Sequence, residues 1–138
     1  FSKLEYNSGM NPIRDLITEL KLNQKADINF QGSEVHLEMR EDGDKIHFLT
    51  SVYDGGNYIP PSVRSGIKQK VPFEDTSFSS YLTIDEEHFQ IHLHHDEPSR
   101  TSTGRLFNQI DRFCFLAEEW RDFLDRNDRS DLVPVRAK

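Results

Sequence analysis

Hydrophobic positions follow helical spacing at both ends of the chain and alternate with polar positions in between. Near the N-terminus, Ile13, Leu16, Ile17 and Leu20 recur three or four residues apart, which is the spacing of one helix face. Pro12 suits the first helical position, where its missing N–H group costs nothing. We therefore predict a helix over residues 11–22, too short to be stable unless its stripe packs on the domain.

A strict alternation of apolar and polar residues predicts strands in the next segment. It covers residues 27–31, 34–40 and 46–52, and Asp42-Gly43 between the last two is a strong hairpin signal. Residues 54–77 are rich in Gly and Pro, and a short helix over 62–71 is weakened by Gly66. Two further strands, over 78–84 and 88–95, flank an acidic turn.

The longest periodic segment lies near the C-terminus and predicts a core-facing helix from about residue 103 to 125. Its apolar positions are three or four residues apart: Leu106, Ile110, Phe113, Ala117, Trp120 and Leu124. The resulting order, α-βββ-α-ββ-α, predicts an α+β fold with an antiparallel sheet of about five strands between N- and C-terminal helices. We expect a flexible lead-in at 1–10, one domain at 11–126 and a charged tail at 127–138.

Composition and charge narrow the function. The 138 residues fit one domain, and ten Phe compensate for an apolar fraction of only 35%. A net charge of −7 argues against nucleic acid and anionic membranes as partners. The single cysteine, Cys114, excludes an intramolecular disulfide, and no apolar run is long enough to span a membrane. We expect a cytoplasmic protein.

Candidate chemistry is sparse. His92 and His94 lie two apart on a predicted strand and so point to one face, where His36 and His47 also fall. A metal-binding protein or metal-dependent enzyme using His92 and His94 is therefore one alternative, although no third ligand is singled out. The other interpretation is a solvated strand face with ordinary histidine titration, with no metal and no cofactor. Cys114 lies between Phe113 and Phe115, which favours a buried, inert thiol.

The predicted elements have more apolar surface than one helix would require to cover the sheet. The C-terminal stripe is long enough to cover one sheet face, so the first helix has apolar residues left for a partner groove. The opposite interpretation is that both helices complete the core, as amphipathic helices usually do. An adaptor domain of a larger assembly is a further alternative. Nothing in the sequence predicts an enzyme.

The order of elements resembles the class I chaperones of bacterial type III secretion, which are small, acidic, homodimeric α+β proteins. Three stretches carry the resemblance: Asn11–Leu22, the paired strands YLTIDEEHFQIHLHH, and the helix LFNQIDRFCFLAEEWRDFL. One stretch departs from it, because GGNYIPPSVRSGIKQK is rich in Gly and Pro where the family has a Leu-rich middle helix.

The resemblance implies a chaperone that holds the N-terminal, non-globular segment of a secreted effector protein soluble and competent for secretion, in the bacterial cytoplasm and without a cofactor. Apolar effector side chains would fill grooves made by the first helix and the sheet, and we expect them to contact Ile13, Leu16, Ile17, Leu20, Ile28 and Phe30. The resemblance also implies a homodimer. We expect its interface on the last hairpin, at Phe78, Leu82, Ile84, Phe89 and Ile91.

Overall fold

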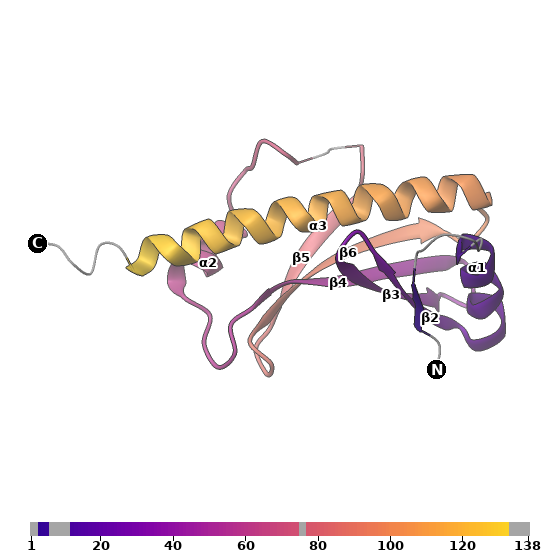
Figure 1. Cartoon of the computed structure of the whole chain (residues 1–138), viewed down its shortest axis with the longest axis horizontal. Coiled ribbons are helices and arrows are strands. Elements are labelled where there is room, and N and C mark those ends of the chain that lie inside the picture. The colour runs from indigo at the N-terminus through magenta and orange to yellow at the C-terminus, as the bar shows by residue number, and fades with distance from the viewer. Residues whose placement is uncertain (1–2, 6–11, 75–76, 133–138) are drawn as a thin grey trace, which may run out of the picture.

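One sheet organises the chain, and a long helix runs across one of its faces (Figure 1). The computed structural model describes residues 3–5, 12–74 and 77–132. In the described residues the sheet has six strands in the order β1-β2-β3-β4-β6-β5. The elements along the chain are β1 Lys3–Glu5, α1 Pro12–Asn23, β2 Lys25–Phe30, β3 Ser33–Arg40, β4 Lys45–Asp54, α2 Pro61–Gly66, β5 Ser80–Asp85, β6 Gln90–Pro98 and α3 Thr103–Leu132.

The predicted α-βββ-α-ββ-α order is confirmed, because β2 to β6 form an antiparallel sheet flanked by helices. One strand lies outside that prediction. Within the expected lead-in at 1–10, the structure describes Lys3–Glu5 as β1, which pairs in parallel with β2 at one sheet edge. Three residues carry too little pattern to predict a strand.

Turn chemistry explains the register of the first hairpins. Glu41, Asp42 and Gly43 all have positive φ, with 89° at Gly43, so the predicted Asp-Gly hairpin between β3 and β4 is confirmed. Between β2 and β3, Gln31 and Gly32 form the loop, also with positive φ. These tight turns set the alternation that buries Ile28, Val35 and Phe48 on one face.

Helix α3 covers that inner face of the sheet. Every position of its predicted stripe is buried, and Phe113 packs edge-on against Phe48 with ring centroids 5.4 Å apart. The helix is 30 residues long and continues to Leu132, where a charged tail was expected from residue 127. Contacts hold this extension: Tyr53 Oη donates to Asp128 at 3.0 Å, and Ser62 Oγ donates to the Asn127 carbonyl at 2.9 Å. Among the described helices, none is both long and apolar enough to cross a bilayer.

The short helix α2 packs directly on the C-terminal part of α3. It begins at Pro61 and not at the predicted Ser62, and Gly66 closes it. A Cβ atom at Gly66 would meet the side-chain amide of Asn127 and would lie 3.3 Å from Leu124 Cδ2, so the glycine lies where the two helices approach closely. The same glycine that weakened the helix prediction thus lies at the contact between α2 and α3.

A buried polar cluster joins β6 to the start of α3. His95 and Glu97 share the inner face with Ile91 and Leu93 and are almost completely buried. Glu97 accepts hydrogen bonds from His95 at 2.8 Å, Gln109 at 3.0 Å and Arg105 at 3.0 Å. Burial works to raise the pKa of Glu97, but the hydrogen bonds from Gln109, His95 and Arg105 outweigh it and hold the pKa below its ordinary value.

The other ring nitrogen of His95 lies 2.6 Å from the Ser79 carbonyl oxygen, which can only accept. Both ring nitrogens of His95 therefore lie within hydrogen-bonding distance of an oxygen atom. Its ring stacks on Phe78 at 3.9 Å between centroids. The cluster therefore places a buried, hydrogen-bonded carboxylate between the sheet and α3.

We predict that Glu97→Ala lowers the free energy of unfolding by about 3 kcal/mol, because it leaves the buried side chains of His95 and Gln109 without their hydrogen-bond acceptor. Urea denaturation at neutral pH measures the loss, with the exposed Glu118→Ala on α3 as the matched control. A carboxyl group whose pKa is lowered on folding stabilises the folded state at pH values above its ordinary pKa, and this stabilisation is lost in acid. The difference between wild type and variant should therefore shrink below about pH 4. Equal stability of the two variants at neutral pH would contradict the stabilising role of this cluster.

Candidate partner-binding surfaces

The first helix divides its apolar stripe between the core and the surface. Leu16 is 0% exposed and Leu20 is 2% exposed, whereas Ile17 is half-buried. The side chain of Ile13 lies outside the described residues. Ile28 and Phe30, the other two positions predicted to contact a partner, are core residues, and Phe30 packs edge-on against Phe107.

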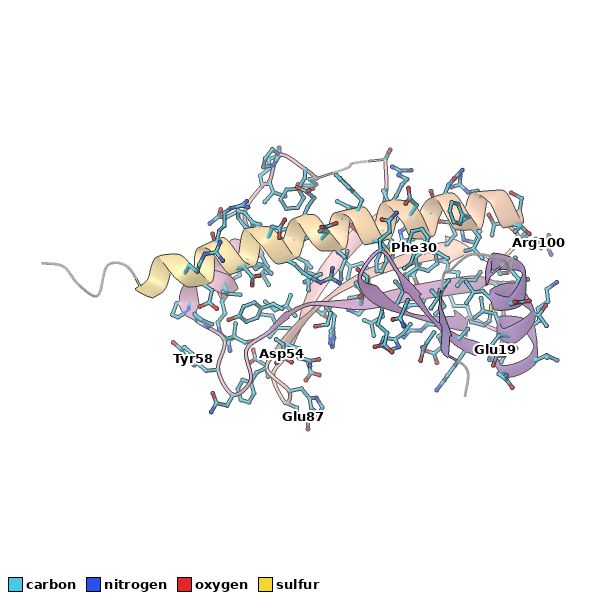
Figure 2. The ribbon with its side chains drawn as sticks, in the orientation of Figure 1. Glu19, Phe30, Asp54, Tyr58, Glu87 and Arg100 are labelled. Carbon is cyan, nitrogen blue, oxygen red and sulfur yellow. The ribbon has the colours of Figure 1, made fainter. Side chains whose placement is uncertain are left out.

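A small hollow lies where α1 meets the ends of β3 and β4 and the start of α3. We call it the α1 hollow; its volume is about 140 Å³. Figure 2 shows Arg100 at this end of the molecule, between α1 and the beginning of α3. The residues that line it are Ile17, Leu20, Lys21, Met39, Ile46, Ser99, Arg100, Thr101 and Leu106. Of the six predicted partner-binding residues, it brings together Ile17 and Leu20.

One polar atom in the α1 hollow has an unmade hydrogen bond. Thr101 Oγ1 is buried and has no partner among the described residues. An unsatisfied buried hydroxyl costs free energy in the isolated chain, and a partner that supplies an acceptor or donor would recover it. Helix α3 begins at Thr103, and Ser102 Oγ accepts from the Arg105 amide at 3.1 Å, so Thr101 is not used as the helix cap.

The residues predicted to form the dimer interface are likewise divided between the core and the surface. Phe78 and Ile91 are buried within the chain, while Leu82 and Ile84 of the edge strand β5 are only partly buried. Phe89 lies in the turn before β6 with φ of 57° and packs partly against the core.

Beside β5, a hollow of about 550 Å³ separates that strand from the chain that follows α2. We call it the β5 hollow. Its apolar lining includes Ile67, Leu82 and Trp120, and Lys68 and Lys70 stand at its rim. Of the five predicted dimer residues, only Leu82 reaches it.

The histidines on the outer sheet face form a hydrogen-bonded row and are not simply solvated. His47 Nδ1 lies 2.7 Å from Asp96, its Nε2 lies 3.0 Å from His94 Nδ1, and His94 Nε2 lies 2.7 Å from Thr83 Oγ1. His47 is only 2% exposed, and Tyr81 stacks on His94 at 4.8 Å. The cross-strand register places these side chains together, which no spacing within one strand could reveal.

Burial in this row, with the neighbouring His47 as a further cause, lowers the pKa of His94 to about 4. The expectation of ordinary titration is therefore wrong for His94, and burial lowers the pKa of His92 as well. Both nitrogens of His94 have hydrogen-bond partners, and His92 Nε2 lies 3.0 Å from Gln90. Among the described residues, the groups able to hold a metal are Asp27-Glu34-His36 and Asp85-Glu87-His88, neither of which contains His92 or His94.

Cys114 is buried on α3, and burial raises the pKa of its thiol to about 12. The thiol is therefore protonated at neutral pH and a poor nucleophile, as predicted.

We predict that His94 stays neutral down to about pH 5 and titrates near its lowered pKa of about 4. The exposed His88 provides an internal control, because its hydrogen bond to the Asp85 carboxylate raises its pKa above the ordinary value. Proton NMR of the ring C–H signals from about pH 3 to pH 8 measures both titrations. Titration of His94 in the range of His88 would show that the row does not form.

No protein-family profile and no curated protein sequence matches the chain. Solved structures do. A chain of the ExsC–ExsE complex matches with a TM-score of 0.59 and 13% identity, over 81% of this chain and 92% of that chain. A chain of the HopA1–SchA chaperone–effector complex matches with a TM-score of 0.54 and 13% identity, over 80% and 90%.

A third match is to the complex of the Yersinia pestis type III secretion chaperone SycH with a stable fragment of YscM2. Its TM-score is 0.50 and its identity 14%, over 76% of this chain and 92% of that chain. In each comparison the likeness spans nearly the whole of the solved chain, so it concerns the complete fold and not a shared motif. The chain therefore has the fold found in these three complexes.

Proposed function

We propose that this chain is a class I type III secretion chaperone, which binds the N-terminal, non-globular segment of a secreted effector protein and catalyses no reaction. The observation that carries the proposal is the fold shared with chaperone–effector complexes, together with a hollow beside α1 that this fold leaves open. The fold alone is a weak guide to function, so the argument depends on what the hollows are able to bind.

The α1 hollow suits an apolar side chain of an extended segment. Ile17 and Met39 are only partly buried, so an inserted aliphatic side chain would complete their burial. Thr101 Oγ1 would then find a partner in the backbone of the segment. Binding of this kind needs neither ATP nor a metal, and it keeps the segment from aggregating by covering its apolar side chains. We propose that it takes place in the bacterial cytoplasm.

We predict that Ile17→Asp abolishes capture of the effector while the domain stays folded. The tagged chaperone is expressed in the native bacterium, and co-purified proteins are tested for secretion by the type III apparatus. Loss of a single aliphatic anchor typically weakens binding by more than about 1 kcal/mol, and a buried carboxylate adds to the loss.

Leu22→Asp on the same helix is the matched control, because Leu22 is 74% exposed and lies outside the hollow. Leu16→Asp is expected to unfold the domain, since Leu16 is 0% exposed. Circular dichroism separates folding from binding. Capture by the Ile17 variant at the level of wild type would place the effector elsewhere.

We also propose a homodimer formed through the edge strand β5 and the β5 hollow. Partly buried Leu82 and Ile84 stand beside an open strand edge, which leaves both apolar area and backbone hydrogen-bonding groups to be covered.

We predict that light scattering at micromolar concentration gives twice the chain mass of 16.1 kDa, and that Leu82→Asp shifts the protein to monomer. The interface should bury at least about 1,000 Å² in total. Leu22→Asp again serves as the control and should remain dimeric. A wild-type protein that is monomeric throughout this range contradicts the dimer.

A further inference from the structure

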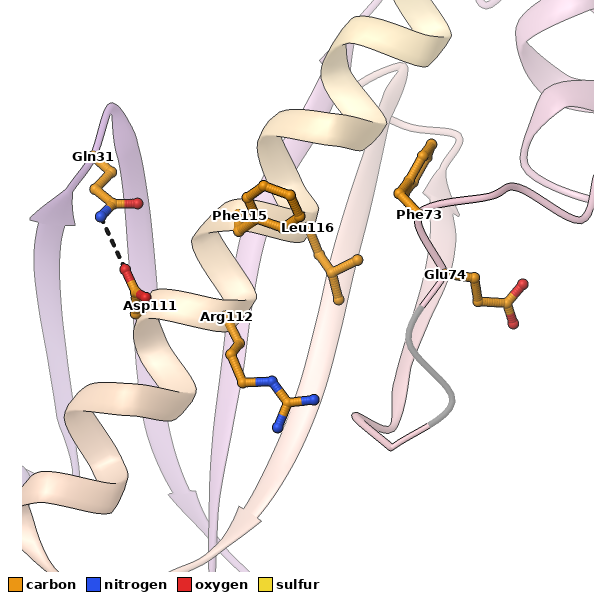
Figure 3. A pocket seen from close by; sticks show the side chains of 7 residues that line it. All are labelled: Gln31, Phe73, Glu74, Asp111, Arg112, Phe115 and Leu116. Carbon is orange, nitrogen blue, oxygen red and sulfur yellow. Dashed lines mark hydrogen bonds between the residues drawn. The ribbon is translucent and has the colours of Figure 1, made fainter.

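A third hollow lies on the side of α3 that faces away from the sheet. It is about 720 Å³ in volume and lies between α3 and the chain around Phe73 (Figure 3). We call it the Phe115 hollow. A volume of this order matches the sites in which proteins hold small ligands or several side chains of a partner.

Three apolar side chains, Phe73, Phe115 and Leu116, line the hollow together with polar and charged ones. Phe115 is 56% exposed, although large apolar side chains on a helix are usually covered. Leu116 lies beside it and is almost completely buried. Phe73, on the opposite wall, packs edge-on against Trp120 with centroids 5.1 Å apart and against Phe123 at 6.1 Å. These aromatic contacts hold the Phe73 ring in place.

The rim of the hollow carries negative charge. Asp111 and Glu74 line it, and among the described residues neither makes an ion pair. Gln31 donates to Asp111 Oδ1 at 2.9 Å from the turn between β2 and β3, which fixes that carboxylate at the rim.

Arg112 also lines the hollow, but its guanidinium is held by other groups. Its Nη2 donates to Ser77 Oγ at 2.8 Å, and its guanidinium carbon lies 5.0 Å from the centre of the Phe78 ring. Neither of these contacts involves Asp111 or Glu74, so both carboxylates can pair with a cation of a partner.

We propose that the Phe115 hollow docks an extended partner segment in which an apolar residue is flanked by Lys or Arg. The apolar side chain inserts between Phe73 and Phe115, and the basic side chain lays its methylene stem along the ring while its charge reaches Asp111 or Glu74. The net charge of −7 strengthens the attraction for such a segment. The identification of the segment as part of a secreted effector rests on the proposed function.

The test uses two short synthetic peptides, one alternating Leu with Lys and the other alternating Leu with Glu, titrated into the full chain with isotope-labelled backbone amides. We expect the Lys peptide to shift the amide signals of Phe115, Leu116 and Phe73, and the Glu peptide to leave them unchanged. Phe115→Ser should remove the shifts, and its own spectrum reports whether the domain is folded. Because Phe115 is more than half exposed, the fold should survive.

The charge variant Asp111→Asn with Glu74→Gln should weaken binding of the Lys peptide about fivefold, as expected for the loss of exposed ion pairs. The matched control, Glu118→Gln with Asp122→Asn, removes the same charge from other exposed positions of α3 and should not weaken it. An equal loss in both variants would mean non-specific attraction to an acidic protein, and would overturn the proposal.

Three other outcomes would also overturn it: binding of neither peptide, shifts confined to the α1 hollow, or conversion of a dimer to monomer by Phe115→Ser, which would make a second copy of this chain the occupant.

The test does not depend on an effector being found. If the chaperone captures no secreted protein and the Lys peptide still binds at Phe115, the proposed function fails and this site stands. If an effector is captured and the peptide does not bind, the proposed function stands and this site fails.

Discussion

The packing of α3 on the inner face of the sheet is the interaction on which the rest of the structure depends. Antiparallel strands with one apolar face are unstable until that face is covered, and α3 is the only described element long enough to cross them all. Its stripe is buried along about five turns, from Leu106 to Leu124. The buried carboxylate of Glu97 lies at one end of this contact, where it accepts hydrogen bonds from His95 of the sheet and from Arg105 and Gln109 of α3.

Helix α3 covers the centre of the sheet, and the three hollows lie around this contact. The α1 hollow lies at one end, where α1 cannot bury all of Ile17. The β5 hollow lies at the sheet edge, and the Phe115 hollow lies on the outer side of α3 itself. A fold that buries its core with one long helix thus keeps several separate hollows with partly apolar linings.

The sequence predicts the secondary structure well because hydrophobic period and turn chemistry are local signals. The stripe from Leu106 to Leu124 and the Asp42-Gly43 hairpin were both predicted for the physical reasons that the structure bears out. Where the predicted ends of helices differ from the observed ones, the cause is a contact with a residue distant in the sequence. Helix α3 continues past residue 126 because Tyr53 and Ser62 hold it there, and Gly66 is tolerated in α2 because α3 approaches it closely.

The candidate sites were harder to predict, because periodicity assigns a residue to a face but does not say how much of that face is covered. Leu16 and Ile17 are adjacent members of one stripe, yet only Ile17 is left at the surface. The same limit applies to the histidines. Alternation placed His47 and His94 on the outer face, but their burial follows from the pairing of β4 and β6 and from Tyr81 on β5, which covers His94. The ring nitrogens of His47 and His94 already make hydrogen bonds, to Asp96 and Thr83 among others. These bonds argue against a metal at this place more strongly than the lack of a third ligand in the sequence did.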